Sequence, residues 1–234
     1  MKLLVVGGVA GGASAAARMR RLDEKAEIIM FERGRHVSFS NCCLPYYLGG
    51  VVENSNSLLL MNPEKFKKMH NIDARVNSEV LSIDRKAHTI QVRDEVTGEV
   101  YTETYDKLVL SPGAVPVRPR SIEGIQGEQV FTIRNVDDIV RVKTYLDRKN
   151  CKNVVVIGGG FIGIECVENL KKTGKYVSLI EAADQIMMPF DYDMVQTLQK
   201  EMYDQGVDMH LSGKVTAITE NAVLYEKDGR TYSV

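Results

Sequence analysis

The sequence predicts an α/β fold that contains the same strand–turn–helix–strand unit twice. Two glycine-rich turns carry this prediction: Gly7–Gly12 follows the apolar run Lys2–Val6, and Gly158–Gly163 follows the apolar run Asn153–Ile157. In each copy a helical pattern follows the turn, and a second apolar strand follows the helix. A chain of 234 residues with 44% hydrophobic residues is long enough for two such units, each with its own core.

The charge composition excludes several classes of function. Thirty Lys and Arg residues balance 31 Asp and Glu residues, and no block of like charge occurs. This argues against binding to nucleic acid or to an anionic membrane surface. The apolar runs are the size of strands, far below the roughly 18 residues of a membrane helix. Lys2–Val6 has no cleavage site after it, so we interpret it as a core strand and expect a cytoplasmic protein.

The first copy has an Ala-rich helix, Ala13–Leu22, and a second strand, Glu27–Phe31, which ends at Glu32. Such a turn lets the backbone approach a pyrophosphate at the helix N-terminus, and the carboxylate accepts a hydrogen bond from a ribose hydroxyl. Val9 stands where the G-x-G-x-x-G pattern has its second glycine, so the match is imperfect. A tight turn without a ligand is the alternative.

The second copy has every element of the dinucleotide fingerprint. The helix Ile164–Thr173 follows a full G-x-G-x-x-G, and the strand Tyr176–Ile180 ends at Glu181. A carboxylate at this position repels a 2′-phosphate, so NADH is favoured over NADPH. Two fingerprints of different quality indicate two nucleotides, a flavin on the first copy and a nicotinamide on the second. The residues of the second turn are Gly158, Gly159, Gly160, Phe161, Ile162 and Gly163.

The cysteines point to the chemistry of a single thiol. Cys42 and Cys43 are adjacent at a predicted helix start, where free N–H groups and the helix dipole stabilise a thiolate. No C-x-x-C pair occurs, and the four histidines are not at ligand spacing, so we predict no metal site. A disulfide between adjacent cysteines is disfavoured because its ring is strained. The other two cysteines are Cys151 and Cys166.

The remaining segments predict short strands, helices and one boundary. Pro and Gly residues between positions 114 and 130 predict the division into modules 1–118 and 119–234. Asn62-Pro63 predicts a helix start, and further helices are predicted at Val136–Lys149 and Asp191–Gln205. Lys107–Leu110, ending at Ser111-Pro112-Gly113, is predicted to be a buried strand. The other predicted strands are Ile72–Val76, Glu79–Asp84, Thr89–Arg93, Thr102–Tyr105 and a β-meander of Val207–Leu211, Val215–Thr219 and Ala222–Glu226.

These motifs together resemble the single-cysteine flavoprotein disulfide reductases, over essentially the whole chain. The family includes coenzyme A-disulfide reductases, NADH oxidases and peroxidases, and NADH-dependent persulfide and polysulfide reductases. The resemblance implies two Rossmann-like modules of the three-layer ββα type, with FAD on the first, NAD(P)H on the second, and Cys42 as the redox cysteine. The matching segments are Gly7–Gly12, Glu32, Ser38-Phe39-x-Asn41-Cys42-x-Leu44-Pro45-Tyr46, Ser111-Pro112-Gly113 and Gly158–Glu165.

The resemblance also assigns residues to ligands. It places FAD along Gly7, Gly8, Val9, Ala10, Gly11, Gly12, Ala13, Glu32, Val80, Gly113 and Arg134. It places NADH at Gly158–Gly163, Glu165 and Glu181, and coenzyme A at Ser14, Arg18, Arg21, Ser38 and Asn41. The alternative for the two arginines is a solvated helix face, and for Glu165 a surface carboxylate. His70 stands where the family has a further lysine.

The implied reaction passes electrons from NADH through FAD to Cys42, and on to coenzyme A disulfide, persulfide or polysulfide. One alternative is an NADH oxidase or peroxidase that uses a Cys42 sulfenic acid, and another is an inactive truncated nucleotide-binding fragment. Two-cysteine chemistry needs C-x4-C, and Val37 and Tyr47 stand at those distances from Cys42. Full-length members are longer and carry a dimerisation domain, so we expect this chain to be truncated within the NAD module and its full-length form to be a homodimer.

Overall fold

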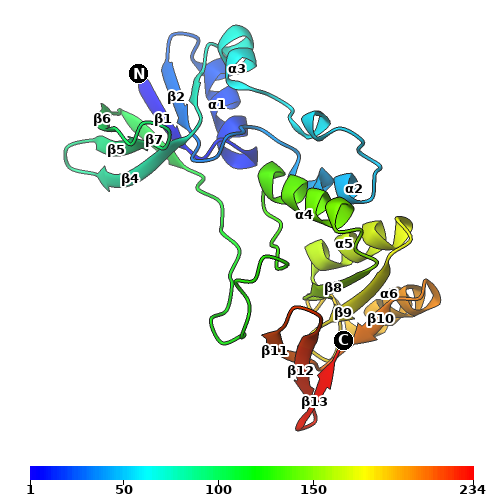
Figure 1. The fold of residues 1–234 in the computed structure, drawn as a ribbon. Coiled ribbons are helices and arrows are strands. Elements are labelled where there is room, and N and C mark those ends of the chain that lie inside the picture. The colour runs from blue at the N-terminus through cyan, green and yellow to red at the C-terminus, as the bar shows by residue number, and fades with distance from the viewer. The chain divides into compact units, whose positions relative to one another are not determined.

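The computed structural model describes all of residues 1–234, and the chain folds into two compact units (Figure 1). The first unit consists of Met1–Ser40 and Asn56–Val115, and the second of Asn41–Ser55 and Pro116–Val234. The cysteine-bearing segment therefore belongs to the second unit, although the predicted module 1–118 includes it. The predicted modules 1–118 and 119–234 were defined by the ligand that each is expected to bind, not by packing, so this division remains a prediction.

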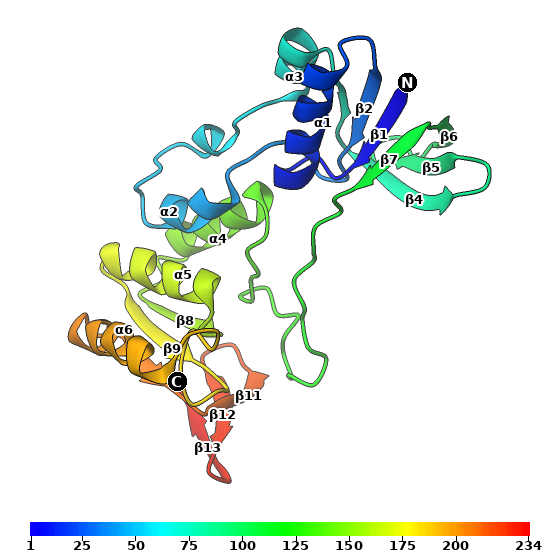
Figure 2. The same ribbon diagram turned by 180° about the vertical axis from the view of Figure 1, so that it is seen from behind.

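The first unit is built on a parallel sheet. Its strands β1 (Lys2–Val6), β2 (Glu27–Phe31), β3 (Asp73–Arg75) and β7 (Lys107–Leu110) lie in the order β3-β2-β1-β7. Helices α1 (Ala10–Leu22) and α3 (Pro63–His70) cover one face (Figures 1 and 2). Alternate residues of β1 face opposite layers, so Leu3 and Val5 pack with the helices and Leu4 packs on the other side.

An antiparallel sheet covers the other face of this parallel sheet. Its strands are β4 (Ser78–Asp84), β5 (Thr89–Asp94) and β6 (Val100–Thr104). Phe31 and Leu4 of the parallel sheet pack against Ile90 and Val92 of β5. The first unit therefore has the three layers, ββα, that the resemblance implies.

One expectation for this unit is wrong. The strand Lys107–Leu110 forms as predicted, but it is not buried, because Leu110 is 57% exposed. The physical reason is its place in the sheet: β7 is an edge strand that pairs only with β1. An apolar run alone does not distinguish an edge strand from a central one.

The cysteine-bearing segment packs within the second unit. Asn41–Cys43 forms one 3-10 turn, and α2 (Leu44–Leu48) follows it with Cys43 as its N-cap residue. This helix packs against α4 (Val136–Arg148) and α5 (Phe161–Lys172). A Cβ on Gly49, just after α2, would lie 2.5 Å from Oδ1 of the fully buried Asn169 of α5. The two helices are therefore in contact at a position where only glycine fits.

The second unit repeats the layered arrangement of the first. Strands β8 (Asn153–Ile157), β9 (Tyr176–Ile180) and β10 (Asp208–His210) form a parallel sheet in the order β10-β9-β8. Helix α6 (Tyr192–Asp204) connects β9 to β10. The antiparallel sheet consists of β11 (Lys214–Ile218), β12 (Val223–Lys227) and β13 (Arg230–Ser233).

The meander prediction is therefore partly wrong. The segment predicted as Val207–Leu211 is not its first strand, because β10 pairs in parallel with β9. The third strand of the meander is β13, which was not predicted. A strand that follows a crossover helix returns parallel to its predecessor, and this connection decides the sheet to which β10 belongs.

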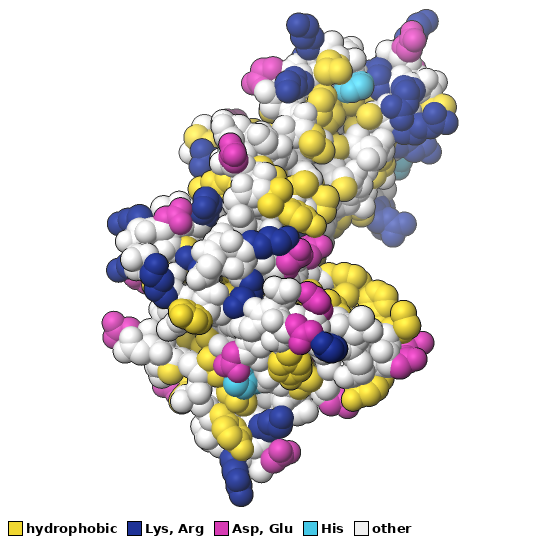
Figure 3. Space-filling model, turned by 90° about the vertical axis from the view of Figure 1, so that its right-hand side faces the viewer, with side chains coloured by type: hydrophobic (Ala, Val, Ile, Leu, Met, Phe, Trp, Pro, Cys, Tyr) yellow, Lys and Arg dark blue, Asp and Glu magenta, His cyan; other side chains and the backbone are white.

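The surface is mixed in character. Lys, Arg, Asp and Glu side chains all occur over the face shown in Figure 3, with hydrophobic side chains between them. The longest helices have 13 residues, and none is long and apolar enough to cross a membrane.

Candidate functional site

The first glycine turn joins β1 to α1 so closely that no side chain fits at Gly7 or Gly12. Gly7 has a φ of +95°, and a Cβ there would lie 1.9 Å from the carbonyl oxygen of Ser111. A Cβ on Gly12 would lie 1.8 Å from the carbonyl oxygen of Gly7. The N-terminus of α1 therefore lies directly on the strand end, with its first N–H groups available to an anion.

Glu32, at the end of β2, is tied to this turn by backbone hydrogen bonds. Gly8 N–H donates to its Oε2 and Gly34 N–H donates to its Oε1, each at 2.8 Å. A carboxylate can accept about four hydrogen bonds, so acceptor capacity remains for a ribose hydroxyl. The two amides fix where that capacity lies.

Four of the residues that the resemblance assigns to FAD line one pocket of the first unit, with a volume of about 340 Å³. These are Gly7, Glu32, Val80 and Gly113. Sequence reasoning missed eight further lining residues, six of which are directly next to predicted ones in the sequence. Arg33 Nη1 lies 3.3 Å from Glu79 Oε1 at the wall of the pocket. The missed residues are Val6, Phe31, Arg33, Ser78, Glu79, Pro112, Ala114 and Val115.

The second glycine turn has the same backbone design. Gly158 has a φ of +105°, and a Cβ on Gly163 would lie 2.0 Å from the carbonyl oxygen of Gly158. Glu181 Oε2 accepts from Gly159 N–H at 2.6 Å, and its Oε1 accepts from Ala183 N–H at 2.8 Å. The two turns therefore hold a carboxylate in the same way.

The structure also explains the imperfect first motif. Val9 and Gly160 are the N-cap residues of α1 and α5, with φ values of −98° and −80°. Any residue adopts these φ values, and a Cβ on Gly160 would meet nothing within 4 Å. The glycine that Val9 replaces in the pattern is therefore not required by the backbone.

The other residues predicted on the second turn lie at the start of α5. Phe161 and Ile162 are exposed, and the ring of Phe161 meets that of Phe190 edge-on at 5.9 Å. Glu165 is half-buried one turn further on, and its carbonyl oxygen accepts from Asn169 Nδ2 at 2.8 Å.

None of the four cysteines is in a disulfide, and their surroundings are very different. Cys42 is exposed, Cys43 and Cys151 are half-buried, and Cys166 is buried. Burial, with a smaller effect of the Glu165 charge, raises the pKa of Cys166 to about 12. Cys166 is therefore a protonated core residue near neutral pH, whereas Cys42 lies at the surface.

The residues assigned to coenzyme A are divided between the units. Ser14, Arg18 and Arg21 are exposed on one face of α1, and the backbone N–H of Ser38 donates to Gly8 O at 2.8 Å. Asn41 belongs to the second unit, and its Oδ1 is buried without a hydrogen-bond partner. Arg134, assigned to FAD, also belongs to the second unit, where its backbone N–H donates to Asp138 Oδ2 at 3.0 Å.

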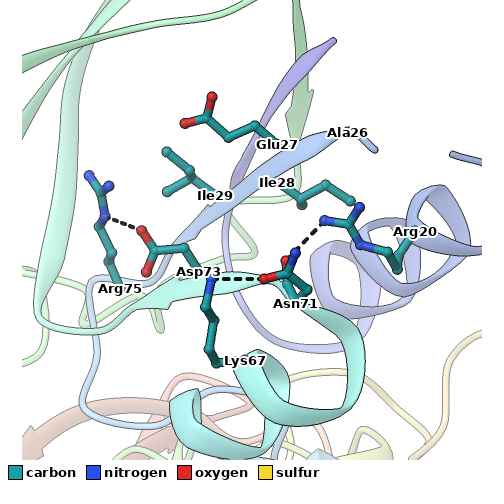
Figure 4. A pocket seen from close by; sticks show the side chains of 9 residues that line it. All are labelled: Arg20, Ala26, Glu27, Ile28, Ile29, Lys67, Asn71, Asp73 and Arg75. Carbon is teal, nitrogen blue, oxygen red and sulfur yellow. Dashed lines mark hydrogen bonds and ion pairs between the residues drawn. The ribbon is translucent and has the colours of Figure 1, made fainter. Parts of the chain in front are cut away.

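A second pocket of the first unit, about 230 Å³ in volume, lies at the opposite, amino ends of β2 and β3 (Figure 4). Glu27 and Asp73, the first residues of these strands, line it. Arg20, the one buried arginine of α1, reaches its wall and donates to the carbonyl oxygens of His70 and Asn71. These bonds close the C-terminal end of α3, so we assign Arg20 a structural role.

Comparisons with known proteins agree on the family. The model of the family described as pyridine nucleotide-disulphide oxidoreductase matches residues 1–234. The chain is 37% identical over 229 residues to a coenzyme A disulfide reductase of Staphylococcus aureus (strain bovine RF122 / ET3-1), covering 98% of this chain and 51% of that protein. The chain thus spans about half the length of the curated relatives it matches.

Two solved structures are similar over the whole chain. The crystal structure of reduced Bacillus anthracis CoADR-RHD has a TM-score of 0.93 at 48% identity, covering 99% of this chain and 42% of that one. The structure of a NAD-dependent persulfide reductase from A. fulgidus has a TM-score of 0.92 at 32% identity, covering 100% and 44%. The predicted α/β fold of two Rossmann-like modules is confirmed.

Proposed function

Because the chain belongs to the pyridine nucleotide-disulphide oxidoreductase family, we propose that it is the nucleotide-binding part of an FAD-dependent reductase. Electrons pass from NADH through FAD to Cys42, and from there to coenzyme A disulfide, a persulfide or a polysulfide. The observation that carries the proposal is the pair of glycine turns with tethered carboxylates, in one chain with an exposed cysteine. A single such turn would be compatible with many nucleotide-binding proteins.

The residues of the first pocket fit FAD. Gly7 and Gly12 let β1 and α1 pack closely at the turn, the N-terminus of α1 suits a pyrophosphate, and Glu32 suits a ribose. Val80 and Gly113 line the same pocket. When bound, FAD supplies a two-electron carrier between a dihydronicotinamide and sulfur.

The second turn suits NADH for the same reasons. The N-terminus of α5 faces the pyrophosphate, and Glu181 accepts from the adenosine ribose. A 2′-phosphate would bring further negative charge to that carboxylate, so we propose NADH over NADPH. Glu165 is proposed to position the nicotinamide. Phe161 and Ile162 lie at the turn as exposed apolar contacts.

Cys42 is the proposed nucleophile. Its thiolate attacks one sulfur of a disulfide RSSR, so that a Cys42–S–R bond forms and the S–S bond breaks. The leaving RS⁻ takes a proton from water, and two further electrons from NADH are needed to release the second RS⁻ and restore the thiolate. Cys43 is half-buried, and we assign it no step.

Coenzyme A is the proposed sulfur carrier on the basis of charge. Arg18 and Arg21 share an exposed face of α1 with Ser14, and guanidinium groups bind phosphates through charge-assisted hydrogen bonds. Ser38 and Asn41 complete the proposed contacts. The buried Asn41 Oδ1 accepts no hydrogen bond within the protein, so it could accept one from a ligand. We also propose that the full-length protein is a homodimer.

A second candidate is an NADH oxidase. A water-forming NADH oxidase from Lactobacillus brevis is similar in structure, with a TM-score of 0.89 at 32% identity over 99% of this chain and 51% of that one. In that case Cys42 would become a sulfenic acid during turnover, and oxygen or peroxide would be the acceptor.

The experiment uses the full-length protein and its matched carboxylate variants. FAD and NADH affinities are measured by fluorescence for the wild type, Glu32→Gln and Glu181→Gln. We expect Glu32→Gln to weaken FAD alone and Glu181→Gln to weaken NADH alone, each by about ten- to 150-fold, since one charge-assisted hydrogen bond is worth about 1.5–3 kcal/mol. Loss of both ligands in both variants would contradict the assignment of one nucleotide to each turn.

Anaerobic NADH oxidation then tests the cysteine. With coenzyme A disulfide or polysulfide, Cys42→Ser should abolish turnover and Cys43→Ser should largely retain it. In separate assays with oxygen or peroxide as the acceptor, a response of the wild type to these acceptors alone would select the oxidase candidate. The reverse pattern of the two serine variants would move the nucleophile to Cys43.

A further inference from the structure

The third parallel strand of each unit holds the backbone of the turn carboxylate. In the first unit, Glu32 N–H donates to Arg75 O at 2.8 Å, and Ser78 N–H donates to Glu32 O at 2.9 Å. In the second unit, Glu181 N–H donates to His210 O at 3.0 Å, and Gly213 N–H donates to Glu181 O at 2.9 Å. Arg75 and His210 therefore occupy equivalent positions, each the last residue of its strand.

The side chains at these positions are held in the same way. Arg75 Nε pairs with Asp73 Oδ2 at 2.9 Å, and its Nη1 donates to Tyr101 Oη of β6 at 3.3 Å (Figure 4 shows the pair with Asp73). His210 Nε2 lies 2.9 Å from Asp208 Oδ2, and its Nδ1 lies 2.9 Å from Tyr225 Oη of β12. We call each arrangement a clamp. In it, the side chain of Arg75 or His210 bonds both to the Asp two residues earlier in the strand and to a Tyr of the antiparallel sheet.

Arg75 Nη1 also pairs with Glu103 Oε2 of β6 at 3.0 Å, a partner that His210 lacks. The two clamps differ further in one chemical property. Burial acts to lower the pKa of Arg75, but hydrogen bonds to Tyr101 and Asp73 raise it overall, so Arg75 keeps its charge at every working pH. Histidine is the side chain whose charge ordinarily changes between about pH 5 and pH 8. The same position thus holds a permanently charged guanidinium in the first unit and an imidazole in the second.

We propose that His210 is a positioning residue for the dinucleotide of the second turn, and that its protonation tightens the hold on Glu181 and thereby on NADH. The inference rests on the proposed NADH site. His210 acts through its carbonyl oxygen, which orients the Glu181 backbone, while the Glu181 carboxylate meets Gly159 and Ala183 at the turn. The ring fixes where that carbonyl oxygen lies.

The groups that face the ring determine the direction of the effect. Neutral His210 donates from Nε2–H to Asp208 and accepts from Tyr225 Oη, whereas the imidazolium donates to both and also pairs with the Asp208 charge. Burial, and then the charge of Asp208, raise the pKa of Tyr225, so this phenol stays neutral. Ser178 Oγ of β9 donates to Asp208 at 3.2 Å, and Tyr232 of β13 stacks on Tyr225. Protonation therefore adds an attraction and reverses the hydrogen bond to Tyr225, so the number of hydrogen bonds to the ring stays the same.

The experiment measures NADH affinity between about pH 5.5 and pH 8, above the titration of ordinary carboxylates. We expect the wild type to bind about two- to fivefold more tightly at the acid end, the range of a partly exposed ion pair. His210→Arg should bind tightly at both ends, and His210→Gln should bind weakly at both ends. His88→Gln, which removes a histidine of the first unit, is the matched control and should keep the wild-type profile.

A ligand-free readout separates this inference from the proposed function. Hydrogen exchange of the Gly159 and Ala183 amides should slow on acidification in the wild type, after correction for intrinsic exchange, and should show no such change in His210→Gln. If the wild type binds no NADH at any pH, the proposed second site fails and this inference fails with it. If NADH binds but the pH profile is the same in the wild type and both His210 variants, the positioning role alone is overturned.

Discussion

The two glycine turns have the same backbone and different surroundings. Gly7 is in close contact with the carbonyl oxygen of Ser111, the residue just after β7. β7 in turn pairs with β1 along its length. Gly158 has nothing within 4 Å of the position of a Cβ, and β8 is an edge strand of its sheet. The residues of a turn therefore determine its conformation, whereas segments far away in the sequence determine how tightly it is enclosed.

The difference extends along the strands that lead into the turns. Val5 of β1 is fully buried in the core between the parallel sheet and the helices, and β1 has a neighbouring strand on each side. Val156 occupies the equivalent position of β8 and is only half-buried. Matched substitutions at these positions measure how much the surroundings contribute to the stability of each unit.

The largest expected effect is at the glycines themselves. Gly7→Ala should destabilise the first unit by about 3 kcal/mol or more, because it combines a strained φ with a backbone clash. Gly158→Ala should destabilise the second unit by only about 1–2 kcal/mol, because it has a similarly strained φ but no atom near the new Cβ. Hydrogen exchange of the strand amides of β1 and β8 measures each loss locally. Equal losses would mean that the enclosure of Gly7 contributes nothing.

The next effect is at the two valines. Val5→Ala should lower the free energy of unfolding of the first unit by about 2–3 kcal/mol, since it leaves a cavity in a closed core. Val156→Ala should cost about 1 kcal/mol, because solvent already reaches that side chain. Urea unfolding followed by peptide-resolved exchange gives both values. A larger loss for Val156→Ala would contradict the view that β8 is the less enclosed strand.

The smallest effect concerns acid stability. Glu103 of β6 is 17% exposed and accepts from Lys2 Nζ and Arg75 Nη1. Burial acts to raise the pKa of Glu103, but these two hydrogen bonds lower it overall, so the stabilisation is present above about pH 4.5 and is lost as the pH falls through the lowered pKa. Glu103→Gln should remove about 1–2 kcal/mol at neutral pH. The difference from the wild type should vanish in acid.

The comparison in the second unit is Asp208→Asn, at a more exposed carboxylate. Its carboxylate is 62% exposed, so solvent screens its pairing with His210. We expect a smaller change in unfolding free energy at neutral pH than for Glu103→Gln, measured by urea titration at several pH values. A larger loss for Asp208→Asn than for Glu103→Gln would mean that exposure is a poor guide to the strength of these ion pairs.

The elements next to the turns could be predicted from the sequence because their signals are local. Strands β1, β2, β8 and β9 have the predicted bounds, and Asn62 caps α3 by accepting from Lys65 N–H at 2.8 Å. Apolar runs, glycines and cap residues carry this information within a few positions. Part of the candidate site could be predicted for the same reason: Gly7, Glu32, Val80 and Gly113, which were predicted from motifs or from the resemblance that the motifs carry, line one pocket.

The features that sequence reasoning missed depend on distant contacts. The exposure of Leu110 and the parallel pairing of β10 follow from where each strand joins its sheet, which no short window specifies. His210 offered no motif at all. Its role became visible only because its position in the second unit could be compared with that of Arg75 in the first.

The division of the chain has a consequence for any attempt to separate the two units. The polypeptide passes between them three times, after Ser40, after Ser55 and after Val115. A gene fragment that ends near Val115 would carry α2 without α4 and α5, the helices against which α2 packs. Cys42, the proposed nucleophile, would then be expressed without the helices that support α2. Co-expression of residues 1–115 and 116–234 as two polypeptides should restore that support, because residues 41–55 can complete the second unit in trans.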